Sequence, residues 1–111
     1  MNMPVFQILL TLTESSRDAS GMLEALAELD DRGRQPSMAS LYRNLKRAVE
    51  QEWLEIVDEG SQPRAAGRPG QVYRITDRGT AAVRAEAVRL KDLAARALSR
   101  DSVPKAESAD V

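Results

Sequence analysis

Cysteine and histidine are both absent from the 111-residue sequence. Without cysteine there is no disulfide and no thiolate metal ligand, and without histidine the other usual zinc ligand and the commonest general base are missing. Nucleophilic sites that pair serine or cysteine with histidine are excluded as well. The remaining carboxylates, lysines and tyrosines lack the spacing of a catalytic or metal site. We therefore expect neither an enzyme nor a protein that holds a metal or cofactor.

Aromatic residues and long apolar segments are also scarce. Aromatic residues make up 4% of the sequence, and no apolar run approaches the roughly 20 residues that span a bilayer. The stretch from Met1 to Leu12 lacks the basic start and small-residue cleavage site of a signal peptide. With 42% hydrophobic and 30% charged residues, the composition is that of an ordinary globular chain. We expect one cytoplasmic domain with no membrane partner.

Charge is nearly balanced overall, with a formal net charge of -1, but it is separated along the chain. Residues 32–47 hold five basic and no acidic residues, and residues 61–78 hold four arginines and one aspartate. Residues 14–31 carry six acids and one arginine, and residues 48–60 carry five acids and no base. A basic face on a near-neutral protein can still bind nucleic-acid phosphates, although charge runs are also common on ordinary solvated surfaces.

Apolar residues recur at helical spacing in three segments of the first half of the chain. Pro4 suits the first turn of the first segment, Asp18 or Ser20 can cap the second, and Pro36 with Ser37 marks the start of the third. The apolar positions of the three segments are Val5, Phe6, Leu9, Leu10 and Leu12, then Met22, Leu23, Leu26, Ala27 and Leu29, then Leu41, Leu45, Ala48 and Val49. We expect three helices, each with one buried face.

The side of the third helix opposite its apolar stripe is basic and polar. Its members are Ser40, Arg43, Asn44, Lys46 and Arg47, with Tyr42 at the flank. Long cations reach phosphates and guanine edges, and serine, asparagine and tyrosine can bond to phosphates or base edges. This face predicts a recognition helix for double-stranded DNA. The alternative is an ordinary surface helix with outward cations.

Two alternating segments, 54–57 and 72–76, follow the third helix and predict a pair of strands. The connection between them is about 11 residues long, rich in glycine and proline, and too long for a tight hairpin. Arg64 and Arg68 lie near its tip, where arginine suits the negative potential of a minor groove. We expect a DNA-binding wing, the alternative being a mobile connector whose arginines serve solubility.

The last helix is expected to begin at Thr76, whose hydroxyl group can cap it. Its stripe of small and apolar residues consists of Val83, Ala87, Leu90, Leu93, Ala94, Ala97 and Leu98. A domain this small has little surface to cover such a stripe, so the stripe predicts a homodimer interface, or else a helix that packs only on its own domain. A dimer would place two recognition helices roughly 34 Å apart and would bind a pseudo-palindromic operator.

Trp53, the single tryptophan, lies between the third helix and the first strand. Core packing is its expected role, and an effector pocket for a small planar aromatic ligand is the alternative, because such ligands bind well against indole. Residues 99–111 contain few large apolar residues and are expected to form a disordered tail.

Several of these segments together resemble the PadR-like transcriptional regulators. The similar segments are S-M-A-S-L-Y-R-N-L-K-R from Ser37, W-L-E-I-V from Trp53, and G-R-P-G-Q-V-Y-R-I-T-D-R-G from Gly67. The resemblance covers roughly Val5 to Leu98. It implies a winged helix fold, a homodimer built largely through the C-terminal helix, and repression by operator binding.

The resemblance also places DNA contacts and shows two departures. The positions that correspond to DNA-contacting residues are Ser37, Ser40, Tyr42, Lys46, Arg64 and Arg68. We add Arg43 and Arg47 because they are expected on the exposed face of the third helix. The second helix starts with Asp18, Ala19 and Ser20 where the family commonly has a His-Gly-Tyr-like start. Glu52 stands where the family often has glycine before the first strand.

The sequence thus predicts a mainly α fold with a small β-hairpin (α+β), namely a winged helix-turn-helix domain over residues 1–76. A dimerisation helix over residues 77–98 and a tail over 99–111 complete the chain. The expected function is sequence-specific transcriptional regulation, with repression favoured, by a homodimer on DNA. The alternative is a winged helix that binds proteins through its acidic surfaces, residues 14–31 and 48–60.

Overall fold

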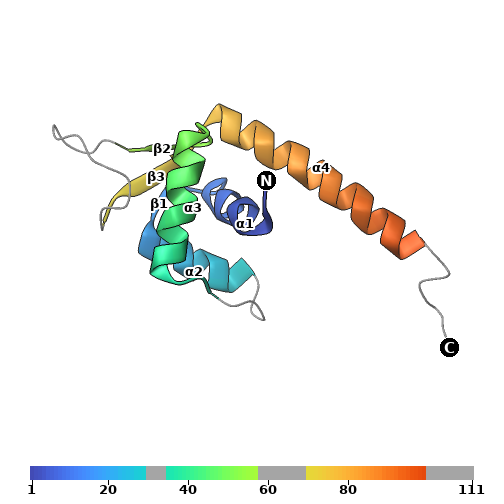
Figure 1. Cartoon of the computed structure of the whole chain (residues 1–111), viewed down its shortest axis with the longest axis horizontal. Coiled ribbons are helices and arrows are strands. Elements are labelled where there is room, and N and C mark those ends of the chain that lie inside the picture. The colour runs from blue at the N-terminus through green and yellow to red at the C-terminus, as the bar shows by residue number, and fades with distance from the viewer. Residues whose placement is uncertain (30–34, 58–69, 100–111) are drawn as a thin grey trace.

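The computed structural model describes residues 1–29, 35–57 and 70–99. Its elements in chain order are α1 (Met3–Leu12), β1 (Arg17–Asp18), α2 (Ala19–Leu29), α3 (Met38–Glu50), β2 (Leu54–Ile56), β3 (Val72–Ile75) and α4 (Asp77–Ser99). Figure 1 shows α1, α2 and α3 gathered beside the small sheet, with α4 leading away from them. The prediction of a mainly helical chain with a small sheet is confirmed. The tail beyond Ser99 and the tip of the predicted wing lie outside the described residues.

A side-chain oxygen caps the start of each of the helices α1 to α4. The capping atoms are Oδ1 of Asn2, Oδ1 of Asp18, Oγ of Ser37 and Oγ1 of Thr76. Each accepts a hydrogen bond from the backbone N–H three residues further on, at 2.8–3.1 Å. A cap of this kind stabilises a helix by about 1 kcal/mol. The starts predicted at Asp18, Ser37 and Thr76 are confirmed.

The sheet has three antiparallel strands in the order β1-β3-β2, one more than the predicted hairpin. β2 pairs with β3 so that Leu54 lies opposite Ile75 and Ile56 opposite Tyr73. β1 pairs Arg17 with Tyr73 on the other edge of β3. The two-strand prediction was therefore incomplete, because β1 is only two residues long and has no alternation of its own.

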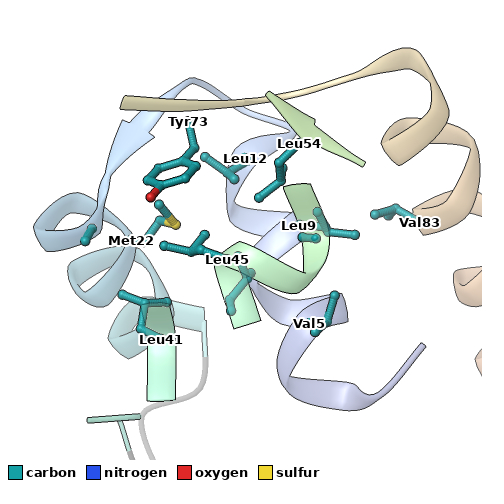
Figure 2. Close-up of a cluster of buried hydrophobic side chains, with 12 residues drawn as sticks. Val5, Leu9, Leu12, Met22, Leu41, Leu45, Leu54, Tyr73 and Val83 are labelled. Atoms are coloured by element: carbon teal, nitrogen blue, oxygen red, sulfur yellow. The ribbon is translucent and has the colours of Figure 1, made fainter. Parts of the chain in front are cut away.

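The core lies where the three N-terminal helices, the sheet and the start of α4 meet (Figure 2). Its buried members are Val5, Ile8, Leu9, Leu12, Ala19, Met22, Leu41, Leu45, Ala48, Leu54, Tyr73 and Val83. Most apolar positions predicted for the three N-terminal helices are buried or half-buried, but Leu29 is 44% exposed at the end of α2, so its assignment to the buried face was wrong. Among the described residues, no helix combines the length and apolar character needed to cross a membrane.

Glu52, between α3 and β2, has a backbone φ of 65°. Such a left-handed conformation costs a non-glycine residue about 1–2 kcal/mol. Glycine adopts this conformation without that cost, but its greater conformational entropy in the unfolded chain lowers the stability of the fold by about 0.5–1 kcal/mol relative to alanine. The ion pair of Glu52 with Arg78, at 3.7 Å and well exposed, contributes little. The backbone conformation at Glu52 is therefore one that favours glycine.

Glu52→Gly is therefore expected to raise the free energy of unfolding by about 0.5 kcal/mol. Glu52→Ala is the matched control, because it removes the same carboxylate but keeps the unfavourable φ. Urea denaturation of the two variants and the parent measures the difference. A Glu52→Gly protein less stable than Glu52→Ala would contradict the strain assigned to this residue.

Candidate nucleic-acid interface

The body of the domain holds α3 by one face and leaves the opposite face open. Leu41, Leu45 and Ala48 are buried at 0–1% exposure and belong to the hydrophobic core. Figure 2 shows Leu41 and Leu45 within this cluster. Arg43, Lys46 and Arg47 are exposed. Because three and four residues make about one helical turn, these three cations lie together on the solvent face. The predicted separation of the two faces is present in the fold.

The three cations of α3 are free of ion pairs within the described residues, where no carboxylate lies within 4.0 Å of them. Elsewhere several arginines are paired: Arg74 with Glu55 at 2.8 Å, Arg17 with Glu14 at 3.3 Å, and Arg96 with Asp92 at 3.5 Å. An unpaired cation on a surface keeps its charge available for an incoming phosphate. The face of α3 is thus electrostatically suited to a polyanion.

The polar residues predicted on α3 have more varied positions. Ser37 is exposed, and its Oγ accepts from Ser40 N–H at 3.1 Å, so this side chain also starts the helix. Ser40 is half-exposed. Tyr42 is half-buried and packs against the hydrophobic core, which gives it a structural role beside any contact with DNA. Asn44 is likewise half-buried.

The base of the predicted wing is described, whereas Arg64 and Arg68 lie outside the described residues. Val57 N–H donates to Val72 O at 2.8 Å, which continues the β2–β3 pairing by one step toward the wing. Gly70 has a φ of 79°, a conformation that favours glycine. The adjacent side chain of Gln71 is buried at 1% exposure. These contacts fix where the wing leaves and rejoins the sheet.

The stripe of α4 divides into a buried start and an exposed remainder. Val83 is 6% exposed and belongs to the core of its own domain, so it is already covered within one chain. Leu90 is half-buried, while Ala87, Leu93, Ala94, Ala97 and Leu98 are exposed, Leu98 at 87%. Val88, which lies outside the predicted stripe, is 67% exposed. The half of α4 that leads away from the domain in Figure 1 therefore carries uncovered apolar side chains.

Arg89 and Glu86 form an ion pair within α4. Arg89 donates from Nε and from the terminal nitrogen to Glu86, at 3.1 and 2.6 Å. The hydrogen bond to Arg89 lowers the pKa of Glu86, and the same bond raises the pKa of Arg89. Both groups stay charged, so this pair offers no switch near neutral pH.

A hollow of about 240 Å³ lies between α1 and α2. It is lined by Leu10, Thr11, Glu14, Arg17, Ala25, Glu28 and Leu29. Trp53 is not among these residues; it is half-buried and packs against the core, as expected for its structural role. The hypothesis that Trp53 binds an aromatic effector stays a prediction. Within the described residues, no cluster of three carboxylates is placed to hold a metal ion.

A family model described as the transcriptional regulator PadR-like family matches residues 8–85. No curated protein sequence matches the chain. Among solved structures, a PadR-like transcription factor from Bacteroides fragilis superposes with a TM-score of 0.66 at 24% identity, over 85% of each chain. A transcriptional regulator from Clostridium thermocellum gives a TM-score of 0.64 at 15% identity, over 86% of this chain and 92% of that chain.

A PadR family transcriptional regulator from Eggerthella lenta is 26% identical, with a TM-score of 0.53 over 85% of this chain and 82% of that chain. These likenesses confirm the winged-helix fold, and the family match covers most of the chain. The family is one of transcriptional regulators. The chain belongs to the PadR-like family of transcriptional regulators.

Proposed function

We propose that this protein is a sequence-specific DNA-binding regulator, and in particular a repressor that acts as a homodimer. The observation that carries the proposal is the face of α3, where Arg43, Lys46 and Arg47 are exposed and unpaired among the described residues. The opposite face is anchored by the buried side chains of Leu41, Leu45 and Ala48. A helix fits the major groove of DNA, which is about 12 Å wide. Membership in a family of transcriptional regulators supports DNA as the partner.

In the proposed complex, α3 lies in the major groove and the wing with Arg64 and Arg68 lies in or near the minor groove. Arginine and lysine of α3 supply phosphate contacts or bond to guanine, while Ser37 and Ser40 near the start of the helix reach the backbone or base edges. A small dimer that covers promoter DNA needs no further contact to block transcription. We therefore infer repression as the outcome of operator binding.

The salt dependence of binding tests the contacts of Lys46. If Arg43, Lys46, Arg64 and Arg68 touch phosphates in both subunits, about eight contacts give a log-log salt slope of roughly -7. Lys46→Ala is expected to make the slope shallower by about two, because each dimer loses two contacts. Fluorescence anisotropy at several salt concentrations measures the slope.

Arg96→Ala is the matched control for Lys46→Ala. It removes the same charge from α4, where Arg96 is exposed and paired with Asp92. Its slope should equal that of the parent protein. An unchanged slope in Lys46→Ala would remove this residue from the interface, and a complete lack of salt-dependent DNA binding would favour the protein-binding alternative.

The exposed part of the α4 stripe supports the proposed homodimer. Ala87, Ala94 and Ala97 are small enough to let a second helix approach closely, and Leu93 and Leu98 supply apolar area that one chain leaves in contact with water. A second copy of the same helix covers the stripe without a further protein. The resulting two-fold axis would present two α3 helices to one face of DNA.

Ala94→Glu is expected to raise the dimer dissociation constant by about 100-fold or more, because each interface would bury two unpaired carboxylates. Ala95→Glu is the control, since Ala95 is also exposed but lies on another side of α4 and outside the stripe. Analytical ultracentrifugation distinguishes the two variants. Equal dissociation in both would place the interface elsewhere.

A further inference from the structure

The end of α3 and the start of α4 meet at a hydrogen-bonded junction. The single hydroxyl proton of Thr76 is shared between Glu52 O and Trp53 O, with Oγ1–O distances of 2.6 and 3.0 Å. The backbone N–H of Thr76 also donates to Trp53 O, at 3.0 Å. On its other side, Thr76 Oγ1 accepts from Gly79 N–H at 2.9 Å and so caps α4. One side chain therefore holds two carbonyl groups and one helix start.

The two carbonyl groups belong to a segment that is itself bonded to the last turn of α3. Glu52 N–H donates to Val49 O at 2.9 Å, and Trp53 N–H donates to Ala48 O at 3.0 Å. Ala48 is buried in the core, so this turn of α3 is fixed. A continuous chain of hydrogen bonds thus runs from α3 through Glu52 and Trp53 to Thr76 and α4.

Gly79 brings α4 against the same segment. A Cβ atom added at Gly79 would lie 2.1 Å from Trp53 O and 2.9 Å from Trp53 C, both backbone atoms. Every other amino acid would therefore push α4 away from the junction. The closest approach of α4 to the α3–β2 connection is set by the absence of a side chain at this position.

The other contact between α4 and the body of the domain restricts the orientation of the helix less strongly. Val83 points toward Leu9 of α1 (Figure 2), and this apolar contact tolerates sliding and rotation better than hydrogen bonds do. Beyond Leu90, all residues of α4 through Ser99 are exposed. A rotation of 10° at Gly79 would move Ala95, roughly 24 Å along the helix, by about 4 Å. That displacement is comparable to the rise of one base pair, about 3.4 Å.

We propose that Thr76 and Gly79 are positioning residues that set the angle between α3 and α4, and thereby the half-site spacing that the dimer accepts. The proposal rests on the homodimer and DNA binding proposed above. The two α4 helices join the subunits, so their angle to α3 determines how far apart and in which orientation the two α3 helices reach DNA. Specificity for spacing then resides in residues that do not touch DNA.

Two substitutions separate positioning from helix capping. Thr76→Ser keeps a hydroxyl group that can both donate to the carbonyl groups and cap α4. Thr76→Asp keeps a good cap acceptor for Gly79 N–H, but its carboxylate cannot donate to Glu52 O or Trp53 O. Both variants therefore retain the start of α4. Thr76→Asp loses the side-chain hydrogen bonds to the α3–β2 connection and keeps only the backbone bond from Thr76 N–H to Trp53 O.

The first readout is the distance between α3 and α4 within one chain. Because the parent sequence has no cysteine, Ala39→Cys and Ala95→Cys place two unique spin labels at exposed positions of α3 and α4. Labelled protein is diluted with a large excess of unlabelled chain, so that pulsed electron paramagnetic resonance reports the intrachain distance. We expect Thr76→Ser to match the parent, and Thr76→Asp to shift or broaden the distribution by about 4 Å or more. Identical distributions in Thr76→Asp and the parent would overturn the proposal.

The second readout is affinity for a series of duplexes whose half-sites are moved apart or together by single base pairs. The parent and Thr76→Ser should prefer one spacing, whereas Thr76→Asp should lose about tenfold at that spacing and show a shifted or flattened profile, with single half-site affinity unchanged. If Thr76→Asp shows the same dependence of affinity on half-site spacing as the parent, the proposal is overturned. Failure of the parent to bind any duplex instead refutes the proposed function, and the intrachain distance still tests the junction.

Discussion

Replacing Arg43, Lys46 and Arg47 together by glutamine is expected to lower operator affinity by at least about 10³-fold at moderate salt, because six cations per dimer are lost. All three side chains are exposed on one face of α3 and make no ion pair within the described part of the chain. Glutamine is long, polar and a good helix former, so the fold should persist. Anisotropy titration gives the affinity, and thermal unfolding followed by circular dichroism verifies the fold.

A control of equal charge distinguishes a local interface from a general effect of charge. Replacing Arg84, Arg89 and Arg96 of α4 by glutamine removes the same number of cations from exposed positions outside α3. Only long-range attraction to DNA should weaken, and that attraction is screened within about 10 Å at 0.1 M salt. Equal losses of affinity in the two triple variants would show that α3 is not the DNA-binding surface.

Gly79→Ala is expected to reduce the free energy of unfolding by about 3 kcal/mol, because the added methyl group must displace backbone. Its Cβ would lie 2.1 Å from Trp53 O and 2.8 Å from Cγ1 of Ile75. The Trp53 carbonyl group is held by Thr76 and cannot rotate away as a flexible side chain could. The gain in helix propensity, about 1 kcal/mol, is too small to compensate. Urea denaturation measures the change.

Gly21→Ala is the matched control, since it makes the same substitution in the first turn of α2. Its added Cβ would lie 3.2 Å from Oδ1 of Asp18, the end of a side chain that can adjust. We expect a change within about 1 kcal/mol of the parent, because the gain in helix propensity is opposed by any movement of the Asp18 carboxylate, which caps α2. Gly21→Ala and Gly79→Ala proteins of equal stability would contradict the close contact assigned to Gly79.

The helices could be predicted from the sequence because their signals are local. Ser37 and Thr76 precede their helices directly, and apolar residues three and four apart define the buried face of α3. The strand β1 could not be predicted, because two residues carry no period and the strand exists only through pairing with β3. Leu29 has the spacing of a core residue, but the core ends before it. Spacing alone does not tell where a helix leaves the core.

The candidate interface was partly predictable for the same reason. The face with Arg43, Lys46 and Arg47 follows from the period of α3, and the half-buried state of Tyr42 follows only from three-dimensional packing. The junction of α3 and α4 had no signal in the sequence beyond the capping role of Thr76. Its hydrogen bonds join residues 23 and 24 positions apart in the sequence. The requirement for glycine at position 79 arises from the backbone carbonyl group of Trp53, which is similarly remote in the sequence.

Recognition of a DNA sequence by the dimer is the central step of the proposed function. The decisive measurement is selection of duplexes from genomic fragments by the protein, followed by anisotropy titration of the enriched duplex and a scrambled version at two salt concentrations. We expect an inverted repeat with half-sites about 10 base pairs apart and a preference over the scrambled duplex of about 10³ or more. Absence of enrichment together with absence of binding at low salt would contradict the account and leave the winged helix as a protein-binding module.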